Sequence, residues 1–298
     1  MTPLKTRAIL ALLLTMFLWG SSVVFMRTLA LSLSPENSLA VRYVLLSVIN
    51  VIGLSWLGTW RIPRADWPRF LLAGIAGMAG YNWFVNAGFA LVPAGIGTFV
   101  TMIEPLMIAV LAAAFLGEKL NRYVFIGVAM AIIGSIMLFW TGLTSSSPSA
   151  VPLRGVIYLL ICCTGWAIYT IVTKPLLDRY DSFTVTAATM LIAAPIMIGM
   201  ASEPLDVLAS KHDLRQWAEV VYLVVAAGIG GTLMWNYGTK HLSTTAAGTS
   251  LYLIPVVAVA CGALVLGEVV TFYVIAGGGL MLAGVAAAQF GPELFGRR

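Results

Sequence analysis

Most acidic residues of this sequence lie near the ends of long apolar runs, but one lies well inside a run. Of the 12 acidic residues, only Glu104 is far from a run's end, directly before Pro105. A charged, unpaired carboxylate at that depth costs at least about 2.5 kcal/mol, so Glu104 should face the interior, either protonated or paired. It could bind a substrate ammonium group or carry a coupling proton. A neutral acid hydrogen-bonded to a neighbouring helix is the alternative.

Aromatic residues also lie in the middle of apolar runs. Buried Trp and Tyr side chains need polar partners for their N–H and O–H groups, so several together favour a cavity. Such a cavity would suit a ligand with a π face or an ammonium group. Ordinary core packing would explain any one of these residues alone. The aromatic candidates for substrate binding are Trp19, Tyr81, Phe84, Trp166, Tyr169, Trp235 and Tyr252.

Amide side chains occur at similar depth in the apolar runs. Asn82, Asn86 and Asn236 could bind the carboxylate or ammonium group of a zwitterion. Hydrogen bonding between helices, worth about 0.6 kcal/mol on average, is the alternative. We include Asn82 and Asn236 among the substrate-binding candidates.

Two prolines interrupt apolar runs at matching places. Pro105 and Pro255 each lack an N–H and crowd the carbonyl four residues earlier, at Thr101 and Leu251. In lipid such carbonyls need partners, so these breaks tend to face the protein interior or a watery cavity. The prolines are therefore candidate hinges, and Thr101 is a further binding candidate. A tolerated kink in a packed helix would give the same pattern.

The composition indicates the kind of element that holds these residues. The chain of 298 residues is 60% hydrophobic and only 10% charged, and its mean hydropathy is +0.96. A soluble domain carries about 25% charged residues, so this surface must face lipid. The net charge of +5 comes from basic residues scattered singly between apolar runs. That pattern is typical of membrane-flanking loops and not of a nucleic-acid-binding patch.

The apolar runs predict an all-α membrane protein with ten transmembrane helices. The first run follows Lys5 and Arg7 but is longer than the 7–15 residues of a signal-peptide core, so we expect it to be retained. Four breaks carry helix-capping signals, at Asp66, Asn121, Asp181 and Ser243. The predicted helices lie at about 8–30, 37–59, 67–91, 95–116, 122–142, 153–174, 182–202, 217–238, 243–266 and 270–290.

The basic residues predict the orientation in the membrane. If the N-terminus is inside, the inner segments hold 12 of the 17 Lys and Arg residues and the outer segments hold five. Positive residues favour the cytoplasm, so both termini should be cytoplasmic. An even number of helices agrees with this.

The second half of the chain repeats the first. A shift of 150 residues superposes Leu-Gly-Glu at 116–118 on Leu-Gly-Glu at 266–268, and a shift of 147 pairs Trp19 with Trp166. The sequence thus predicts two five-helix units, at 1–147 and 148–298. Because five is odd, the second unit would be inverted, which is typical of secondary transporters. The other matched pairs include Asn86 with Asn236, Gly88 with Gly238, Pro105 with Pro255, and Arg27 with Lys174.

Charged residues near helix ends have simpler explanations. Arg27, Arg42 and Lys174 can reach lipid headgroups or neutralise helix C-termini. Because Arg27 and Lys174 are related by the repeat, a role at a gate is the alternative. Glu118 and Glu268, beside glycines at helix ends, are interpreted as structural.

The duplication and the two Pro…Leu-Gly-Glu stretches at 105–118 and 255–268 resemble the drug/metabolite transporter superfamily, EamA type. Within it, the chain is most similar to YddG-type exporters of aromatic and other neutral amino acids. The resemblance covers essentially the whole chain. It implies a basket of helices around a central cavity, in a bacterial inner membrane, with a neutral and aromatic amino acid as the exported substrate and no cofactor.

Other functions remain open on sequence alone. The substrate could be a nucleotide sugar, a drug-like cation or a lipid-linked group, and a non-transporting scaffold or channel subunit is not excluded. An enzyme is not expected, because His212 and His241 are predicted in loops and no His-Glu-x-x-His metal motif occurs. Direct ATP drive is not expected either, because no Walker phosphate loop occurs. The glycines of the fifth and tenth helices are explained by close helix packing without a dimer. A monomer is compatible with this, and the oligomeric state stays open.

Overall fold

The computed structural model describes residues 3–29, 33–57, 61–92, 97, 100–145, 152–266 and 272–295, and these contain helices and loops but no strand. The elements of the first half are α1 (Pro3–Leu29), α2 (Pro35–Leu57), η1 (Arg64–Asp66), α3 (Trp67–Leu72), η2 (Ala73–Gly80), α4 (Tyr81–Leu91), α6 (Glu104–Leu116) and α7 (Arg122–Ser145). Those of the second half are α8 (Leu153–Leu177), α9 (Ser182–Gly199), α10 (Leu205–Ser210), α11 (Leu214–Val221), η3 (Tyr222–Gly230), α12 (Gly231–His241), α13 (Thr244–Ser250), η4 (Leu251–Leu253), α14 (Ile254–Leu266) and α15 (Phe272–Phe295).

The helices are those of a multi-pass membrane protein. Six described spans are long and apolar enough to cross a bilayer, and shorter apolar helices lie at Glu104–Leu116, Arg122–Met137 and Ile275–Ala288. Most boundaries lie within a few residues of the predicted ones. The largest differences are that α1 begins at Pro3 instead of near residue 8, that α15 ends at Phe295 instead of near residue 290, and that a turn at 102–103 interrupts the predicted helix at 95–116 directly before α6. A proline at the first helical position suits its fixed φ, which explains the early start of α1.

Three of the four predicted capping residues act as caps. Asn121 accepts hydrogen bonds from the N–H groups of Tyr123 and Val124, Asp181 caps α9, and Ser243 caps α13. The prediction for Asp66 is wrong, because its side chain makes no cap hydrogen bond to α3. Its carboxylate instead accepts hydrogen bonds from more distant residues, described below.

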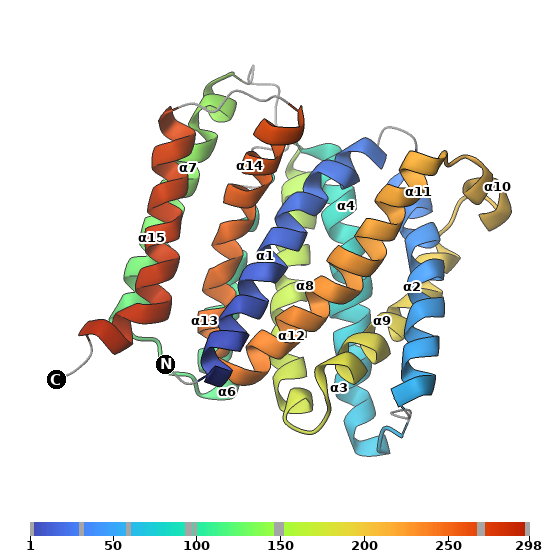
Figure 1. The fold of residues 1–298 in the computed structure, drawn as a ribbon, viewed down its shortest axis with the longest axis horizontal. Helices are drawn as coiled ribbons and strands as arrows, with labels where there is room; N and C mark the ends of the chain where they lie inside the picture. Colours follow the sequence, from blue (N-terminus) through green and yellow to red (C-terminus); the bar gives the residue numbers. More distant parts are fainter. Residues whose placement is uncertain are drawn as a thin grey trace.

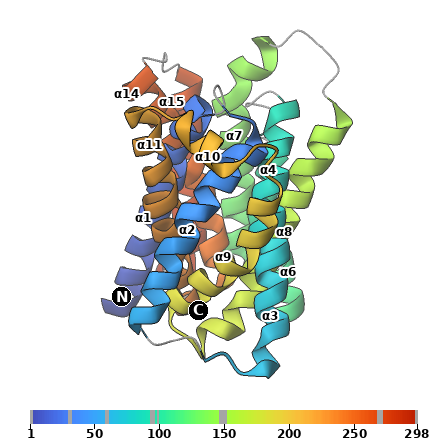
Figure 2. The same cartoon turned by 90° about the vertical axis from the view of Figure 1, so that its right-hand side faces the viewer.

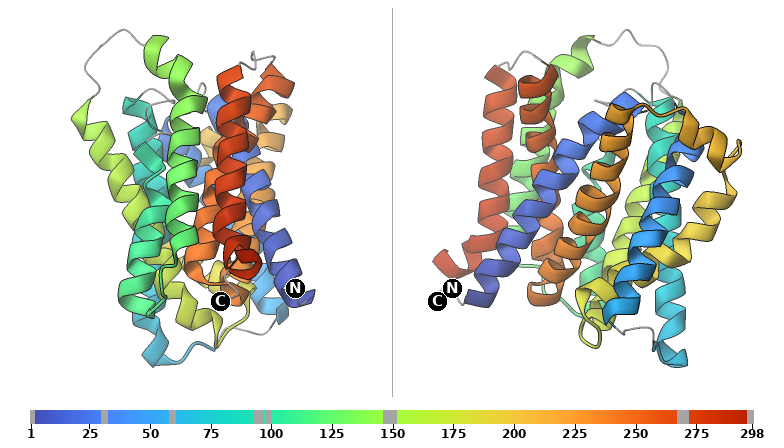
Figure 3. Two further views of the ribbon diagram at one scale, coloured as in Figure 1. Left: turned by 90° about the vertical axis from the view of Figure 1, so that its left-hand side faces the viewer. Right: turned by 45° about the vertical axis from the view of Figure 1, so that its right-hand side comes forward.

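Helices of the two halves pack in matching pairs. α1 packs against α12 and α14, while its repeat counterpart α8 packs against α4 and α6. In Figure 1, α1 and α8 lie in the middle of the bundle, α7 and α15 lie together at one side, and α2 lies at the other. Figure 2 shows the second of these sides, where α2 lies beside α9. α1 begins and α15 ends at the same end of the bundle (Figure 3).

Both halves contain a π-helical segment at equivalent positions. The segments η2 and η3 each connect two α-helices within one continuous helical stretch, and they lie about 150 residues apart in the chain. π-Helical segments leave the regular hydrogen-bond ladder and are frequent at functional sites.

The candidate hinge prolines also interrupt their helices in equivalent ways. Pro105 is the second residue of α6, which follows a turn at residues 102–103. Pro255 is the second residue of α14, which follows the 3₁₀ segment η4. Proline is favoured in the first turn of a helix, whereas in the interior it removes a backbone hydrogen bond, so a break directly before each of these prolines is favourable. Pro175 and Pro195, by contrast, lie inside α8 and α9.

The glycines of α7 and α15 bring these two helices into backbone contact. A Cβ atom on Gly127 would lie 2.5 Å from the carbonyl oxygen of Gly284, and one on Gly134 would lie 2.5 Å from that of Gly277. This confirms that the small residues serve helix packing within the chain, as Figure 3 shows for α7 and α15.

Candidate functional site

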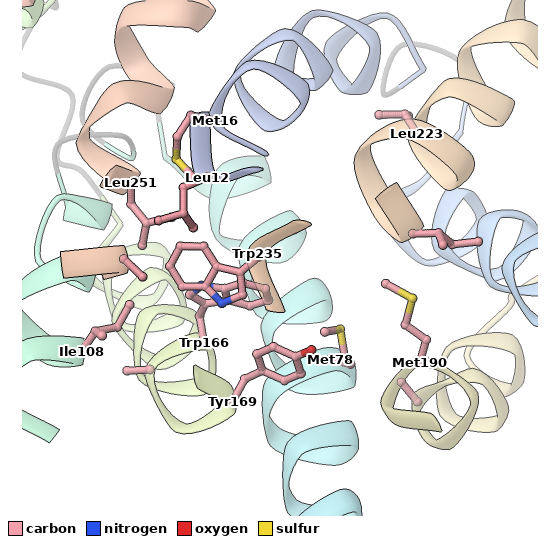
Figure 4. Packing of buried hydrophobic residues seen from close by; sticks show 14 of the residues in the cluster. Leu12, Met16, Met78, Ile108, Trp166, Tyr169, Met190, Leu223, Trp235 and Leu251 are labelled. Carbon is pink, nitrogen blue, oxygen red and sulfur yellow. The ribbon is translucent and has the colours of Figure 1, made fainter. Parts of the chain in front are cut away.

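Five of the predicted aromatic residues form one cluster where the two halves meet. The Trp166 ring lies 5.1 Å from Trp19, 5.8 Å from Trp235, 4.9 Å from Tyr169 and 5.1 Å from Tyr81, measured between centroids. These side chains come from α1, α4, α8 and α12. Figure 4 shows Trp166, Tyr169 and Trp235 turned toward one another. We refer to these five residues as the aromatic cluster.

The aromatic cluster is buried, yet some of its polar atoms have no partner. Trp235 and Tyr169 are fully buried and Trp166 is 3% exposed. Within the described ranges, the indole N–H groups of Trp166 and Trp235 and the Oδ1 atom of Asn236 make no hydrogen bond, and neither does the buried hydroxyl of Tyr252 on η4. An unsatisfied buried polar group costs about 1–3 kcal/mol, so such groups at one place indicate a site for a ligand or for water.

The remaining polar groups of the cluster orient it. The Asn236 amide donates hydrogen bonds to the Tyr169 hydroxyl (2.8 Å) and to the Thr186 hydroxyl (2.9 Å). The Trp19 indole N–H donates to the carbonyl oxygen of Ala227 (2.9 Å), which lies in the π-helical segment η3. A Cβ atom on Gly231 would lie 2.4 Å from the Trp19 nitrogen, so only glycine allows this approach of α1 to α12.

Glu104 is buried at the start of α6, which packs against α8. It is 8% exposed and lies within hydrogen-bonding reach of the Cys163 thiol. It also lies within electrostatic range of Tyr81, a member of the aromatic cluster. The Cys163 thiol is 4.0 Å from the carbonyl oxygen of Thr101, one of the carbonyls crowded by proline. The prediction that Glu104 faces the protein interior is therefore confirmed.

Two predicted site residues lie away from the cluster. Asn82 donates hydrogen bonds to the Tyr43 hydroxyl of α2 (3.2 Å) and to the carbonyl oxygen of Met78 (2.8 Å). Phe84 contacts Trp83 and Tyr158, at 4.9 and 5.4 Å between centroids. Trp83 and Tyr158 also line a separate cavity of about 290 Å³. The other residues lining it are Pro35, Glu36, Ala87, Ala90, Leu91 and Arg154.

Lys174 neutralises a helix C-terminus, as one of the two predictions for it states. Its ammonium group donates hydrogen bonds to the carbonyl oxygens of Thr239, Lys240 (3.4 Å) and Leu242 (2.9 Å) at the end of α12. The side chain of its repeat counterpart Arg27, also predicted at a gate, lies outside the described residues.

Glu118 binds the start of α13, a helix of the other half. Its carboxylate accepts hydrogen bonds from the N–H groups of Thr244 (2.6 Å) and Thr245 (2.9 Å) at the start of α13. Burial alone would raise the pKa of Glu118, but these hydrogen bonds hold it below its usual value. Glu118 therefore ties the segment after α6 to the start of α13.

The structure gives Asp66 and Arg42 surroundings that the sequence did not predict. Asp66 accepts hydrogen bonds from Arg179 and from the Tyr180 hydroxyl, each at 2.8 Å. Arg42 of α2, predicted to reach lipid headgroups or to neutralise a helix C-terminus, has no acidic partner within ion-pair distance among the described residues. The hydrogen bonds of Asp66 join residues more than 100 positions apart. No local sequence pattern signals these bonds or the lack of an acidic partner for Arg42.

No three of the described His, Cys, Asp and Glu side chains are placed to hold a metal ion.

Known proteins with similar sequences are membrane transporters. A probable terminal-alkyne amino-acid exporter of Streptantibioticus cattleyicolor is 30% identical, over 94% of this chain and 92% of its own. A probable amino-acid metabolite efflux pump of Salmonella typhimurium is 24% identical (94% and 93%). An uncharacterised inner membrane transporter, YedA, of Escherichia coli is 27% identical (96% and 91%).

The fold and the family agree with these similarities. A solved crystal structure superposes with a TM-score of 0.80 at 21% identity, over 96% of this chain and 97% of its own, so the two share a fold. The EamA-like transporter family matches residues 6–140 and again 153–288, once for each half of the chain. The protein therefore belongs to the EamA-like transporter family and is a transporter rather than an enzyme.

Proposed function

We propose that this protein is a secondary transporter that exports neutral, chiefly aromatic, amino acids across a bacterial inner membrane by alternating access. The observation that carries the proposal is the aromatic cluster, which offers buried rings and unpaired indole N–H groups where the two halves meet. A ring of the solute would stack there, and its polar groups would satisfy donors that otherwise cost free energy.

The proposed architecture has ten spans in two inverted five-helix repeats, at 1–147 and 148–298, with both termini cytoplasmic. The family match to each half supports the duplication. The equivalent π-helical segments and proline breaks support it as well. Pro105 and Pro255, with Arg27 and Lys174, would act as hinges and gates when the halves exchange conformations around the cluster.

Two charged residues could recognise a zwitterion. Glu104, buried at the start of α6, would attract the ammonium group of the solute. Arg42, about 10 Å into α2 from Pro35 at 1.5 Å per residue, would attract the carboxylate. An unpaired arginine in a transmembrane helix is costly, and a functional role is the first hypothesis for it. The names of two relatives, an amino-acid exporter and an amino-acid metabolite efflux pump, support a solute of this class.

A thermal-unfolding panel tests the proposal on purified protein. A ligand at 100 times its Kd stabilises the folded state by about 2.7 kcal/mol. We expect tryptophan and phenylalanine to raise the melting temperature, and lysine, glutamate and a nucleotide sugar to leave it unchanged. Stabilisation by the nucleotide sugar alone would contradict the proposed substrate but not the family, and stabilisation by none of them would contradict a solute site at the cluster.

A further inference from the structure

The turn between α12 and α13 is held from two sides by residues of other helices. On one side, Lys174 of α8 donates hydrogen bonds to three carbonyl oxygens at the end of α12. On the other, Glu118, which follows α6, accepts hydrogen bonds from two N–H groups at the start of α13. The two charges also attract each other across the turn. We refer to Glu118, Lys174 and the turn at 239–245 as the latch.

The latch lies between the aromatic cluster and one end of the bundle. Lys174 is eight residues beyond Trp166 on α8, which is about 12 Å along the helix. Thr239 is one turn beyond Trp235, and its hydroxyl donates to the Trp235 carbonyl oxygen (3.0 Å). In this structure α12 and α13 are therefore tied to α6 and α8 directly beyond the cluster. A solute could not pass from the cluster to this end of the bundle unless these helices separated.

The chemistry of the latch suits a contact that forms and breaks. Each side pairs a full charge with the partial charges of unsatisfied groups at a helix end, which gives strong and geometrically specific hydrogen bonds. Lys174 is only half-buried. Released partners can therefore be hydrated, and release does not leave a charge stranded in the core.

The same pair of residue types recurs in the other half. A shift of 150 residues relates Glu118 to Glu268, and a shift of 147 relates Lys174 to Arg27. Glu268 and the side chain of Arg27 lie outside the described residues, so this correspondence rests on sequence alone. In an inverted repeat, the second pair belongs to the opposite face of the membrane.

We propose that Glu118 and Lys174 form a latch that closes the cytoplasmic end of the solute pathway, and that both sides of it break when that end opens. The proposal rests on the proposed transport cycle with cytoplasmic termini. Glu118 and Lys174 act as positioning residues: they do not contact the solute but set the balance between the two conformations.

Cysteine accessibility in nanodiscs tests the latch without any solute. Cys162, Cys163 and Cys261 are replaced by serine or alanine, and Ala247→Cys is introduced as a reporter. Ala247 is fully buried in α13, one turn beyond the latch. We expect Glu118→Gln and Lys174→Met each to raise the rate of labelling by a hydrophilic maleimide at least about tenfold, equivalent to about 1.4 kcal/mol.

The matched controls separate the latch from general loosening of the protein. Glu203→Gln and Lys211→Met change the same residue types in an exposed ion pair elsewhere, and we expect no change in labelling. The Glu118→Gln/Lys174→Met double variant should label little faster than either single variant, because either change opens the same latch. Glu268→Gln should slow the labelling by favouring the opposite conformation, whereas a merely loosened protein would label faster.

Several results would overturn the proposal. One is unchanged labelling in both single variants that melt like the parent protein, and another is equal acceleration in the Glu203→Gln control. Faster labelling in Glu268→Gln would also contradict it. Because the assay needs no amino acid, failure of the latch is distinguishable from failure of the proposed substrate, which is judged by ligand-dependent melting alone.

Discussion

At the scale of single residues, the proposed binding site depends on the indole N–H groups of Trp166 and Trp235, which are buried without a partner among the described residues. We expect Trp166→Phe, which keeps a ring and removes the N–H, to weaken tryptophan binding by about 2–13-fold. That range corresponds to the loss of one hydrogen bond worth about 0.5–1.5 kcal/mol. Binding of radiolabelled tryptophan to purified protein measures the effect.

Trp83→Phe is the matched control for that change. Trp83 contacts Phe84 and Tyr158 and has no ring contact with the aromatic cluster among the described residues. Its replacement should leave the Kd for tryptophan unchanged. Equal weakening in both variants would mean that the Trp166 N–H has no special role in binding.

The role of Arg42 can be tested by changing the ligand and the protein together. If Arg42 pairs with the carboxylate, Arg42→Gln should weaken tryptophan binding by about tenfold or more, since hydrogen bonds to charged groups contribute about 1.5–3 kcal/mol. The same variant should leave binding of tryptamine, which lacks the carboxylate, nearly unchanged. Competition against labelled tryptophan gives both constants, and an equal loss for both ligands would assign Arg42 to the fold.

Glu118 should make stability depend on pH. Hydrogen bonds from Thr244 and Thr245 hold its pKa below the usual value in the folded protein. The stabilisation is therefore complete above the unfolded pKa of about 4.3 and is lost as the pH falls through the folded pKa. We expect the melting temperature of Glu118→Gln to lie below that of the parent at neutral pH and to converge with it in acid. A pH-independent difference would contradict this.

The residue types on the apolar runs predicted many of the residues of the candidate site, but not which of their side chains contact one another. Tyr81 and Phe84 share a helix face in the sequence, yet only Tyr81 joins the cluster, because Phe84 lies one turn farther along and contacts Tyr158. The unpaired state of the indoles depends on where four separate helices cross. No local pattern carries that information.

At the scale of elements, the breaks in the helices could be predicted only where a residue type enforces them. Pro105 and Pro255 predicted interruptions within the helices at 95–116 and 243–266, because proline removes a backbone hydrogen bond from a helix interior, and α6 and α14 begin directly before them. The π-helical segments η2 and η3 were not predicted, because glycine and alanine permit that geometry without requiring it. They are held by tertiary contacts, such as the Trp19 indole on the Ala227 carbonyl oxygen.

The contact between α7 and α15 gives a prediction at this scale. Gly134→Ala would place a Cβ atom 2.5 Å from the Gly277 carbonyl oxygen, and such overpacking costs about 1–3 kcal/mol. Gly279→Ala is the control on α15, since a Cβ atom there has nothing within 4 Å among the described residues. Thermal unfolding should show a lower melting temperature for Gly134→Ala only. Equal melting of the two variants would mean that the helices can separate freely.

At the scale of the whole molecule, the sequence predicted the family and the duplication because the repeat preserves Pro and Leu-Gly-Glu at a fixed spacing. The family match to both halves confirms that reasoning. The substrate could not be predicted in the same way, since it depends on side chains that are brought together only when the halves assemble.

The most direct test of the central claim, that the protein transports a neutral aromatic amino acid bound at the cluster, is counterflow in proteoliposomes. Vesicles loaded with unlabelled tryptophan should transiently accumulate external labelled tryptophan in a saturable way. Trp166→Phe should raise the half-saturating concentration, and Trp83→Phe should not. Folded protein that accumulates no neutral amino acid, under this protocol or under an imposed pH gradient, would contradict the account.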